Sequence, residues 1–231
     1  MSLRERTARA LAWRAREVTE RLPEQWRFAL ESWLPHNWVY GSSYFAAVDS
    51  DAVTSAGPMA DGIARLCSPQ RCVDVGCGTG AFLAALRDRH QVEVRGFEYG
   101  DVARQYCRSR ALEVLPLDLS DAPLAIPPES VDLVTSFEVA EHLPARLADR
   151  FVETLTSARK TVVMSAAVPG QGGTGHVNEQ PREYWIERMQ QHRFRYDSEA
   201  SRQLSEWWRA DGATWWYWQN VAVYRPREAG A

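Results

Sequence analysis

Three alternating glycines, Gly76, Gly78 and Gly80, follow an apolar stretch that ends at Val75. Glycine adopts positive φ without a steric penalty and lets a ligand approach the backbone closely. Residues 81–86 are typical of the first turns of a helix, which present unbonded N–H groups and a partial positive charge. Strand, glycine turn and helix in this order predict the first βα unit of a nucleotide-binding site.

Two classes of ligand fit this turn. The run Gly76-x-Gly78-x-x-Ala81 satisfies the dinucleotide pattern, in which a pyrophosphate lies against the helix N-terminus. Asp74, two residues before the first glycine, suits a ligand with an ammonium group and would repel a pyrophosphate. The glycines alone therefore leave both classes open.

An acidic residue ends the next predicted strand, 92–98. Glu98 lies where both kinds of nucleotide site carry the carboxylate that binds the ribose hydroxyls. A carboxylate accepts hydrogen bonds from two vicinal hydroxyls at once. Tyr99 follows it and is placed to lie against an adenine ring. A solvated acid at the strand end is the alternative for Glu98.

Two histidines are candidates for proton transfer. His176 follows the glycine-rich segment 169–175, at the carboxyl end of a predicted strand, where open α/β sheets bind ligands. His142 follows the predicted strand 130–137. An imidazole titrates near neutral pH, so it can serve as general base for a hydroxyl group. His176 is the stronger candidate, and packing or a backbone hydrogen bond is the alternative for His142.

Aromatic residues flank the predicted site. Tyr40 and Tyr44 precede the glycine turn, and Trp185 lies in the predicted helix 182–191. These three are expected to bind substrate by lining a pocket for a planar or sugar ring. Core packing is the alternative for each of them.

The elements that must position these residues alternate between strands and helices. Short apolar segments predict parallel strands at 72–75, 92–98, 114–117, 130–137 and 161–168, a sixth at 194–196 and a long last one at 214–225. Helices are predicted from residue 81 and at 101–111, 147–158, 182–191 and 199–208.

The region before the glycine turn is predicted to be helical. Helices are expected at 2–22, from Pro23 to a break at 35–37, and at 51–66, with an aromatic stretch around a turn at 38–45. The chain is therefore divided into an N-terminal helical cap or substrate lid, 1–66, and a nucleotide-binding domain, 67–231.

Composition narrows the class of protein. A chain of 231 residues with 45% hydrophobic and 25% charged residues is typical of a soluble globular protein. A net charge of −3 gives no basic field, so nucleic acid is not an expected partner. No apolar run predicts a membrane span or a secretory leader, and the four cysteines lack metal-ligand spacing. These features predict a cytoplasmic protein with reduced thiols and no metal site.

The run Phe137-Glu138-Val139-Ala140-Glu141-His142-Leu143-Pro144 distinguishes between the two ligand classes. Together with Asp74-x-Gly76-x-Gly78-x-Gly80, Glu98 and Asp118, it resembles the class I S-adenosylmethionine-dependent methyltransferases over about residues 70–225. Dehydrogenases of similar fold have no reason to carry this run.

The resemblance implies an α/β fold with a seven-stranded, mostly parallel, doubly wound sheet whose last strand is antiparallel. It implies that the glycine loop wraps the methionine end of the cofactor, that Asp118 accepts from the adenine amino group, and that the Leu119 N–H meets the ring. The expected S-adenosylmethionine-binding residues are Asp74, Gly76, Cys77, Gly78, Gly80, Glu98, Tyr99, Asp118, Leu119, Phe137 and Glu138.

The expected function is methyl transfer to a small-molecule acceptor, by preference a hydroxyl group of a metabolite. Methylation of a small amine or a protein side chain is the alternative. A nicotinamide-dependent oxidoreductase, supported only by the Gly76-x-Gly78-x-x-Ala81 coincidence, and a non-catalytic cofactor-binding protein are less favoured. The sequence identifies neither the acceptor nor the oligomeric state.

Overall fold

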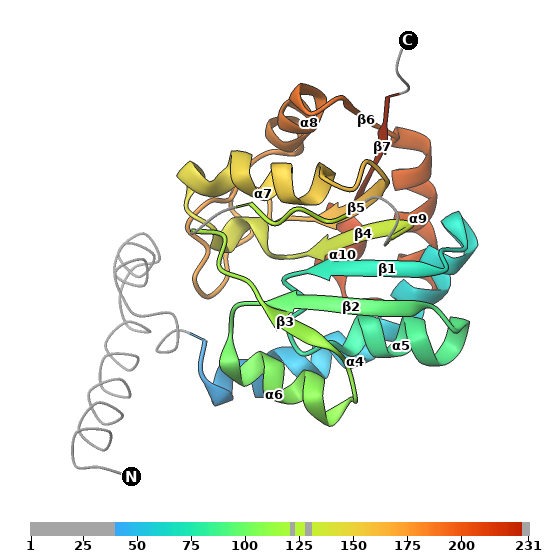
Figure 1. Cartoon of the computed structure of the whole chain (residues 1–231), viewed down its shortest axis with the longest axis vertical. Helices are drawn as coiled ribbons and strands as arrows, with labels where there is room; N and C mark the ends of the chain where they lie inside the picture. Colours follow the sequence, from blue (N-terminus) through green and yellow to red (C-terminus); the bar gives the residue numbers. More distant parts are fainter. Residues whose placement is uncertain (1–39, 121–122, 128–130, 228–231) are drawn as a thin grey trace, which may run out of the picture.

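The structure is a computed structural model that describes residues 40–120, 123–127 and 131–227. The helices predicted at 2–22 and from Pro23 lie outside these residues. Within them the chain forms one seven-stranded sheet in the order β3-β2-β1-β4-β5-β7-β6 (Figure 1). The strands are β1 Arg71–Val75, β2 Glu93–Glu98, β3 Val114–Pro116, β4 Leu133–Phe137, β5 Thr161–Ser165, β6 Phe194–Tyr196 and β7 Ala222–Pro226.

The first five strands are parallel, and β7 runs antiparallel to its two neighbours, β5 and β6. The predicted α/β sheet with an antiparallel last strand is therefore confirmed. Because the parallel strands all end at one edge, the residues that follow them gather there.

Helices cover both faces of the sheet, and each strand contributes alternate residues to two cores. Val73 and Val75 of β1 pack with the helices α7 and α8, whereas Cys72 packs with α4, α5 and α9. The helices are α4 Ser42–Cys67, α5 Ala81–His90, α6 Asp101–Ser109, α7 Ala148–Thr156, α8 Arg182–Gln191, α9 Ser198–Ala210 and α10 Trp215–Asn220.

Helix α4 belongs to the body of the domain. Its residues Met59, Ala60 and Ile63 are buried against Leu83 and Leu86 of α5. It starts at Ser42, earlier than the predicted 51–66, so the aromatic turn expected at 38–45 is in part the first turn of this helix. A separate cap formed by residues 1–66 stays a prediction.

The segment 214–225 departs most from the sequence prediction. It was predicted to be one long strand, but Trp215–Asn220 is the helix α10, and only Ala222–Pro226 is extended. The aromatic residues of α10 pack against Phe137 at the end of β4, with the Phe137 and Tyr217 rings 6.5 Å apart. This tertiary packing overrides the β-propensity of tryptophan and tyrosine. The strands β4 and β5 are also shorter than the predicted 130–137 and 161–168.

None of the helices formed by the described residues is both long enough and apolar enough to cross a membrane.

Candidate active site

A cavity of about 700 Å³ opens at the carboxyl edge of the parallel strands. Its floor is formed by the ends of β1, β2 and β4, and the start of α4 and the helix α10 form the opposite wall. Ten of the predicted cofactor residues line it, and Gly80 does not: Asp74, Gly76, Cys77, Gly78, Glu98, Tyr99, Asp118, Leu119, Phe137 and Glu138. Tyr40, Tyr44, His142 and His176 line it as well.

The glycine turn is held open toward this cavity. All three glycines have positive φ, at 76°, 53° and 77°. A Cβ added at Gly76 would lie 2.6 Å from Val139, and one at Gly80 would lie 2.5 Å from Leu112. A Cβ at Gly78 meets nothing within 4 Å. Gly76 and Gly80 therefore serve packing, whereas Gly78 leaves room for a ligand against the backbone.

Glu98 ties the end of β2 to the glycine turn. Its Oε2 accepts from the Gly78 N–H at 2.9 Å, and its Oε1 accepts from the Gly100 N–H at 2.6 Å. Burial raises the pKa of Glu98, whereas these two N–H groups lower it. A carboxylate has lone pairs beyond these two bonds, so this position fits ribose hydroxyls as well.

Asp74 lies on the floor of the cavity and is only 3% exposed. Its Oδ1 accepts from the Thr135 hydroxyl at 2.8 Å on the neighbouring strand β4. Burial raises the pKa of Asp74 to about 7, and the charge of Glu98 adds to the rise. A cationic ligand in the cavity would favour the ionised carboxylate.

Asp118 and its neighbours form the rim opposite the glycine turn. Asp118 Oδ1 accepts from the Ser120 N–H at 2.8 Å, which fixes the turn after β3. The Arg150 guanidinium donates a hydrogen bond to the Leu119 carbonyl oxygen at 2.8 Å and so fixes the backbone of Leu119. Tyr99 is 48% exposed at the mouth. This rim suits a flat ring lying between apolar side chains and one carboxylate.

Phe137 and Glu138 follow β4 directly. The Phe137 ring lies edge-on to Phe82, with 5.1 Å between ring centroids. Glu138 has a φ of 53°, a strained conformation for a residue other than glycine, of a kind that gathers at active sites and costs about 1–3 kcal/mol. Its carboxylate accepts from Gln171 at 3.1 Å and from Asn220 at 3.3 Å. These two amides were not anticipated from the sequence.

His142 is held by aromatic and backbone partners. Its Nδ1 is hydrogen-bonded to the Tyr40 hydroxyl at 2.8 Å and lies 3.3 Å from the Gly175 carbonyl oxygen. Tyr44 packs edge-on against Tyr40, with ring centroids 5.0 Å apart. Burial raises the pKa of Tyr44, and the carboxylate of Glu141 adds to the rise. Tyr44 is therefore a neutral hydroxyl at neutral pH.

His176 forms a pair with Glu179. Its Nδ1 lies 2.8 Å from Glu179 Oε1, and both side chains are largely buried. Glu179 also accepts from the Gly170 and Gly172 N–H groups, each at 2.8 Å, and so orders the glycine-rich loop. The sequence singled out His176 but not Glu179, although the two are only three residues apart.

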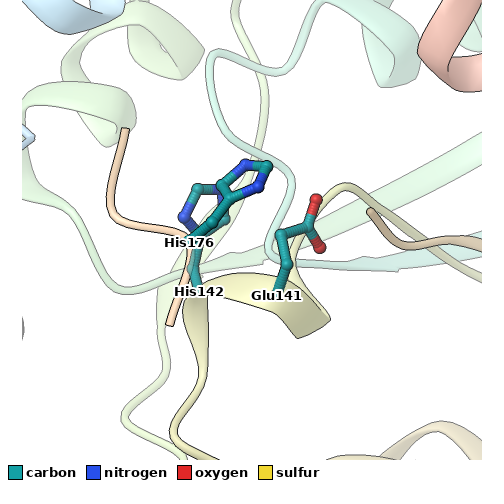
Figure 2. A group of neighbouring side chains, drawn as sticks. All are labelled: Glu141, His142 and His176. Carbon is teal, nitrogen blue, oxygen red and sulfur yellow. The ribbon is translucent and has the colours of Figure 1, made fainter. Parts of the chain in front are cut away.

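The two histidines meet a third residue that the sequence analysis left unassigned. One ligand atom each from Glu141, His142 and His176 lies within 4.8 Å of the others (Figure 2). Glu141 is fully buried, and burial together with the charge of Glu138 raises its pKa well above the ordinary value. The signal was present in the sequence as two acids and a histidine within Glu138–His142.

Trp185 does not line the cavity, contrary to the expectation of a substrate contact. It is 3% exposed and packs edge-on against Phe151 of α7, with ring centroids 6.1 Å apart. Helix α8 turns this face toward α7 and the sheet core. The exposed aromatic wall is formed by Trp215, Trp216 and Tyr217 of α10 instead.

Comparison with known proteins gives one family match. A family model described as a methyltransferase domain matches residues 73–160, which run from within β1 to the residue before β5. A search of curated protein sequences gives no match.

Solved structures share the fold at low sequence identity. The mitomycin 7-O-methyltransferase MmcR has a TM-score of 0.61 at 15% identity, over 93% of this chain and 67% of that one. A putative methyltransferase in a complex with the Haloferax volcanii Trm112 activator has a TM-score of 0.59 at 16% identity, over 83% and 96%. The sugar N-methyltransferase KedS8 from Streptoalloteichus has a TM-score of 0.56 at 14% identity, over 76% and 88%.

The sheet order is that of a Rossmann-like α/β fold, and residues 73–160, which are less than half of the chain, match the methyltransferase-domain model. The same fold is found in the three solved methyltransferase structures named above, at 14–16% identity. The open space above Gly78 and the buried carboxylates of Asp74 and Glu98 fit a cofactor that carries a cationic amino-acid end and a ribose.

Proposed function

We propose that this chain is a class I S-adenosylmethionine-dependent methyltransferase that acts on a hydroxyl group of a small molecule. The observation that carries the proposal is the His176–Glu179 pair, which lies in the same cavity as the glycine turn. Methyl transfer to a hydroxyl needs a group that takes the proton, whereas a neutral amine needs none. A histidine held by a carboxylate is suited to that task because the carboxylate stabilises the imidazolium.

Cofactor and acceptor are assigned to different parts of the cavity. The glycine turn, Glu98 and Asp118 would hold the cofactor, and Tyr40 and Tyr44 would hold the acceptor, with Trp215 and Trp216 as a further aromatic wall. Bound S-adenosylmethionine supplies an activated methyl group on a sulfonium. The protein's task is to align the acceptor oxygen and to exclude water.

The charges along the wall favour a neutral or cationic acceptor. Asp51 and Glu138 line the cavity in addition to Asp74, Glu98 and Asp118, and Arg146 is the one arginine or lysine among the described lining residues. Anionic acceptors would be repelled by this excess of carboxylates. Aromatic faces suit a planar or sugar ring.

N-methylation of a small amine or of a protein side chain is the second candidate. The carboxylates of the wall would attract an amine, and in that case His176 would not be needed as a base. The predicted cytoplasmic location, a small molecule as the only partner and the absence of nucleic acid likewise stay proposals drawn from the sequence.

Two experiments test the proposal in sequence. The first experiment measures thermal unfolding in the presence of S-adenosylmethionine, S-adenosylhomocysteine or NAD. The first two ligands should stabilise the protein, by about 2.7 kcal/mol at a ligand concentration 100 times the dissociation constant, and NAD should not. In the second experiment, hydroxylated metabolites and matched amines are incubated with the protein and a radiolabelled methyl donor. We expect the label to appear in the hydroxyl compounds. Labelling confined to amines would overturn the hydroxyl assignment.

A further inference from the structure

We propose that Glu141, His142 and His176 bind one divalent first-row transition-metal ion at the acceptor side of the cavity. The three residues come from two segments that are far apart in sequence, the turn after β4 and the loop after β5 (Figure 2). One ligand atom from each lies within 4.8 Å of the other two. A bound ion at ordinary ligand distances of about 2.0–2.2 Å would draw them only slightly closer.

The environment of Glu141 is the first independent support. Its side chain is fully buried, and no described residue forms a hydrogen bond of good geometry with either carboxylate oxygen. The backbone N–H groups of Glu141 and Ala167 and the Glu138 carboxyl lie near it without meeting that geometry. By contrast, both oxygens of the buried Glu98 accept from backbone N–H groups. A buried carboxylate so poorly supplied with donors is costly, and a coordinated cation removes that cost.

The outer partners of the histidines are the second support. His176 is hydrogen-bonded through Nδ1 to Glu179, and His142 is hydrogen-bonded through Nδ1 to Tyr40. Metal-binding histidines typically use one ring nitrogen for the ion and give the other to a carboxylate, a carbonyl or a similar partner. The contact with Glu179 therefore leaves Nε2 of His176 for the ion.

Gly173 lies beside the His176 ring. A Cβ at position 173 would lie 2.3 Å from His176 Nε2, so any side chain there would occupy the space beside this nitrogen. Only glycine therefore fits at this position beside the His176 ring. His142 and His176 both line the cavity, so an ion held by them would face the acceptor.

The donor set restricts the choice of metal. Two imidazoles and one carboxylate favour zinc, manganese, cobalt or iron in the divalent state over magnesium or calcium, which prefer oxygen ligands. Three protein ligands leave coordination positions open, as in catalytic rather than structural sites.

The role of the ion rests on the proposed function, whereas its binding does not. An acceptor hydroxyl that occupies an open position would have its pKa lowered, and its proton would pass to water. His176 Nε2 cannot bind the ion and take the proton in the same state. Metal binding and proton removal by this nitrogen are therefore alternative states of the site.

Calorimetric titration of the full chain, stripped with a chelator and free of cofactor, tests the site with MnCl2, CoCl2 and ZnCl2 separately. We expect saturable binding of one ion per chain and, for cobalt, visible absorption bands of a nitrogen- and oxygen-ligated centre. Glu141→Gln and His176→Ala should each weaken binding by more than about 100-fold, and Glu179→Gln by about 10–100-fold. His192→Ala, at the end of α8 and outside the cavity, is the matched control and should bind normally.

Folding and cofactor binding are measured in parallel for each variant. Thermal unfolding and S-adenosylmethionine affinity should stay close to those of the parent chain, because Gln is nearly isosteric with Glu. The proposal is overturned if the parent chain binds none of the three ions, or if Glu141→Gln binds them as tightly as the parent. Either result would leave the assignment of the methyltransferase cofactor intact.

Discussion

The Glu98 carboxylate accepts a hydrogen bond from the backbone N–H of Gly78 at 2.9 Å. The predicted ribose-binding acid is therefore hydrogen-bonded to the turn that is predicted to bind the methionine end. Glu98 ends β2, and Gly78 follows the neighbouring strand β1. The two parts of the cofactor site are thus coupled through one side chain. Loss of that carboxylate should change both the ligand contacts and the shape of the turn.

Glu98→Ala is expected to weaken S-adenosylmethionine binding. Charge-assisted hydrogen bonds contribute roughly 1.5–3 kcal/mol, which corresponds to roughly 10-fold to 150-fold in affinity. Glu93→Ala removes an exposed carboxylate from the other end of the same strand and serves as the control. Equal affinities of the two variants in calorimetry would disprove the ribose assignment.

Gly78→Val should abolish cofactor binding while the fold survives. The turn has a φ of 53° at this position, and an added Cβ would project into open space. Gly212→Val is a matched control, because Gly212 has a φ of 84°, no atom within 4 Å of an added Cβ, and a position outside the cavity. Both variants should lose similar stability from backbone strain. If Gly78→Val binds the cofactor as Gly212→Val does, the turn has been misassigned.

The stability of the cofactor-free protein should fall as the pH rises from about 4 to about 7 because of Asp74. The pKa of Asp74 is about 7 in the folded protein, against an ordinary value of 3.8. The folded state therefore binds the extra proton in this window, and each pH unit removes about 1.4 kcal/mol from the free energy of unfolding. Asp74→Asn should flatten this part of the profile in urea unfolding at pH 5, 6 and 7. An unchanged slope in the variant would show that another group is responsible.

His176→Ala should lower turnover by about 10²–10⁴-fold with cofactor affinity little changed. His142→Ala should reduce both, because His142 is predicted to adjoin the cofactor and its Nδ1 is hydrogen-bonded to the Tyr40 hydroxyl. Turnover is measured across pH 6–9 with the acceptor found in the labelling screen, and His192→Ala is the control. Full activity of His176→Ala would place proton removal elsewhere and favour an amine acceptor.

The cofactor half of the site was accessible from the sequence because it depends on local order. Gly76, Gly78 and Gly80 follow β1 directly, Glu98 ends β2, and Asp118 lies two residues beyond the end of β3. In a parallel sheet, strand ends converge at one edge whatever the details of packing. The sheet topology alone therefore explains why these residues line one cavity.

The acceptor half depends on packing that sequence patterns do not encode. Trp185 was expected in the pocket, but the orientation of α8 buries it against Phe151. The segment that begins at Trp215 was expected to be a strand, but its contacts with Phe137 fold it as a helix over the cavity. Glu141 was overlooked because its distance from His176 depends on a loop conformation.

The position of β7 between β5 and β6 has a consequence for how the chain is made. Residues 194–196 of β6 pair only with residues 224–226, which leave the ribosome later. During synthesis the five parallel strands can associate in chain order and α9 can pack against α4, but β6 gains its strand partner only with β7. Nascent chains arrested before residue 222 should therefore hold the glycine turn in place while the wall formed by α10 is still incomplete.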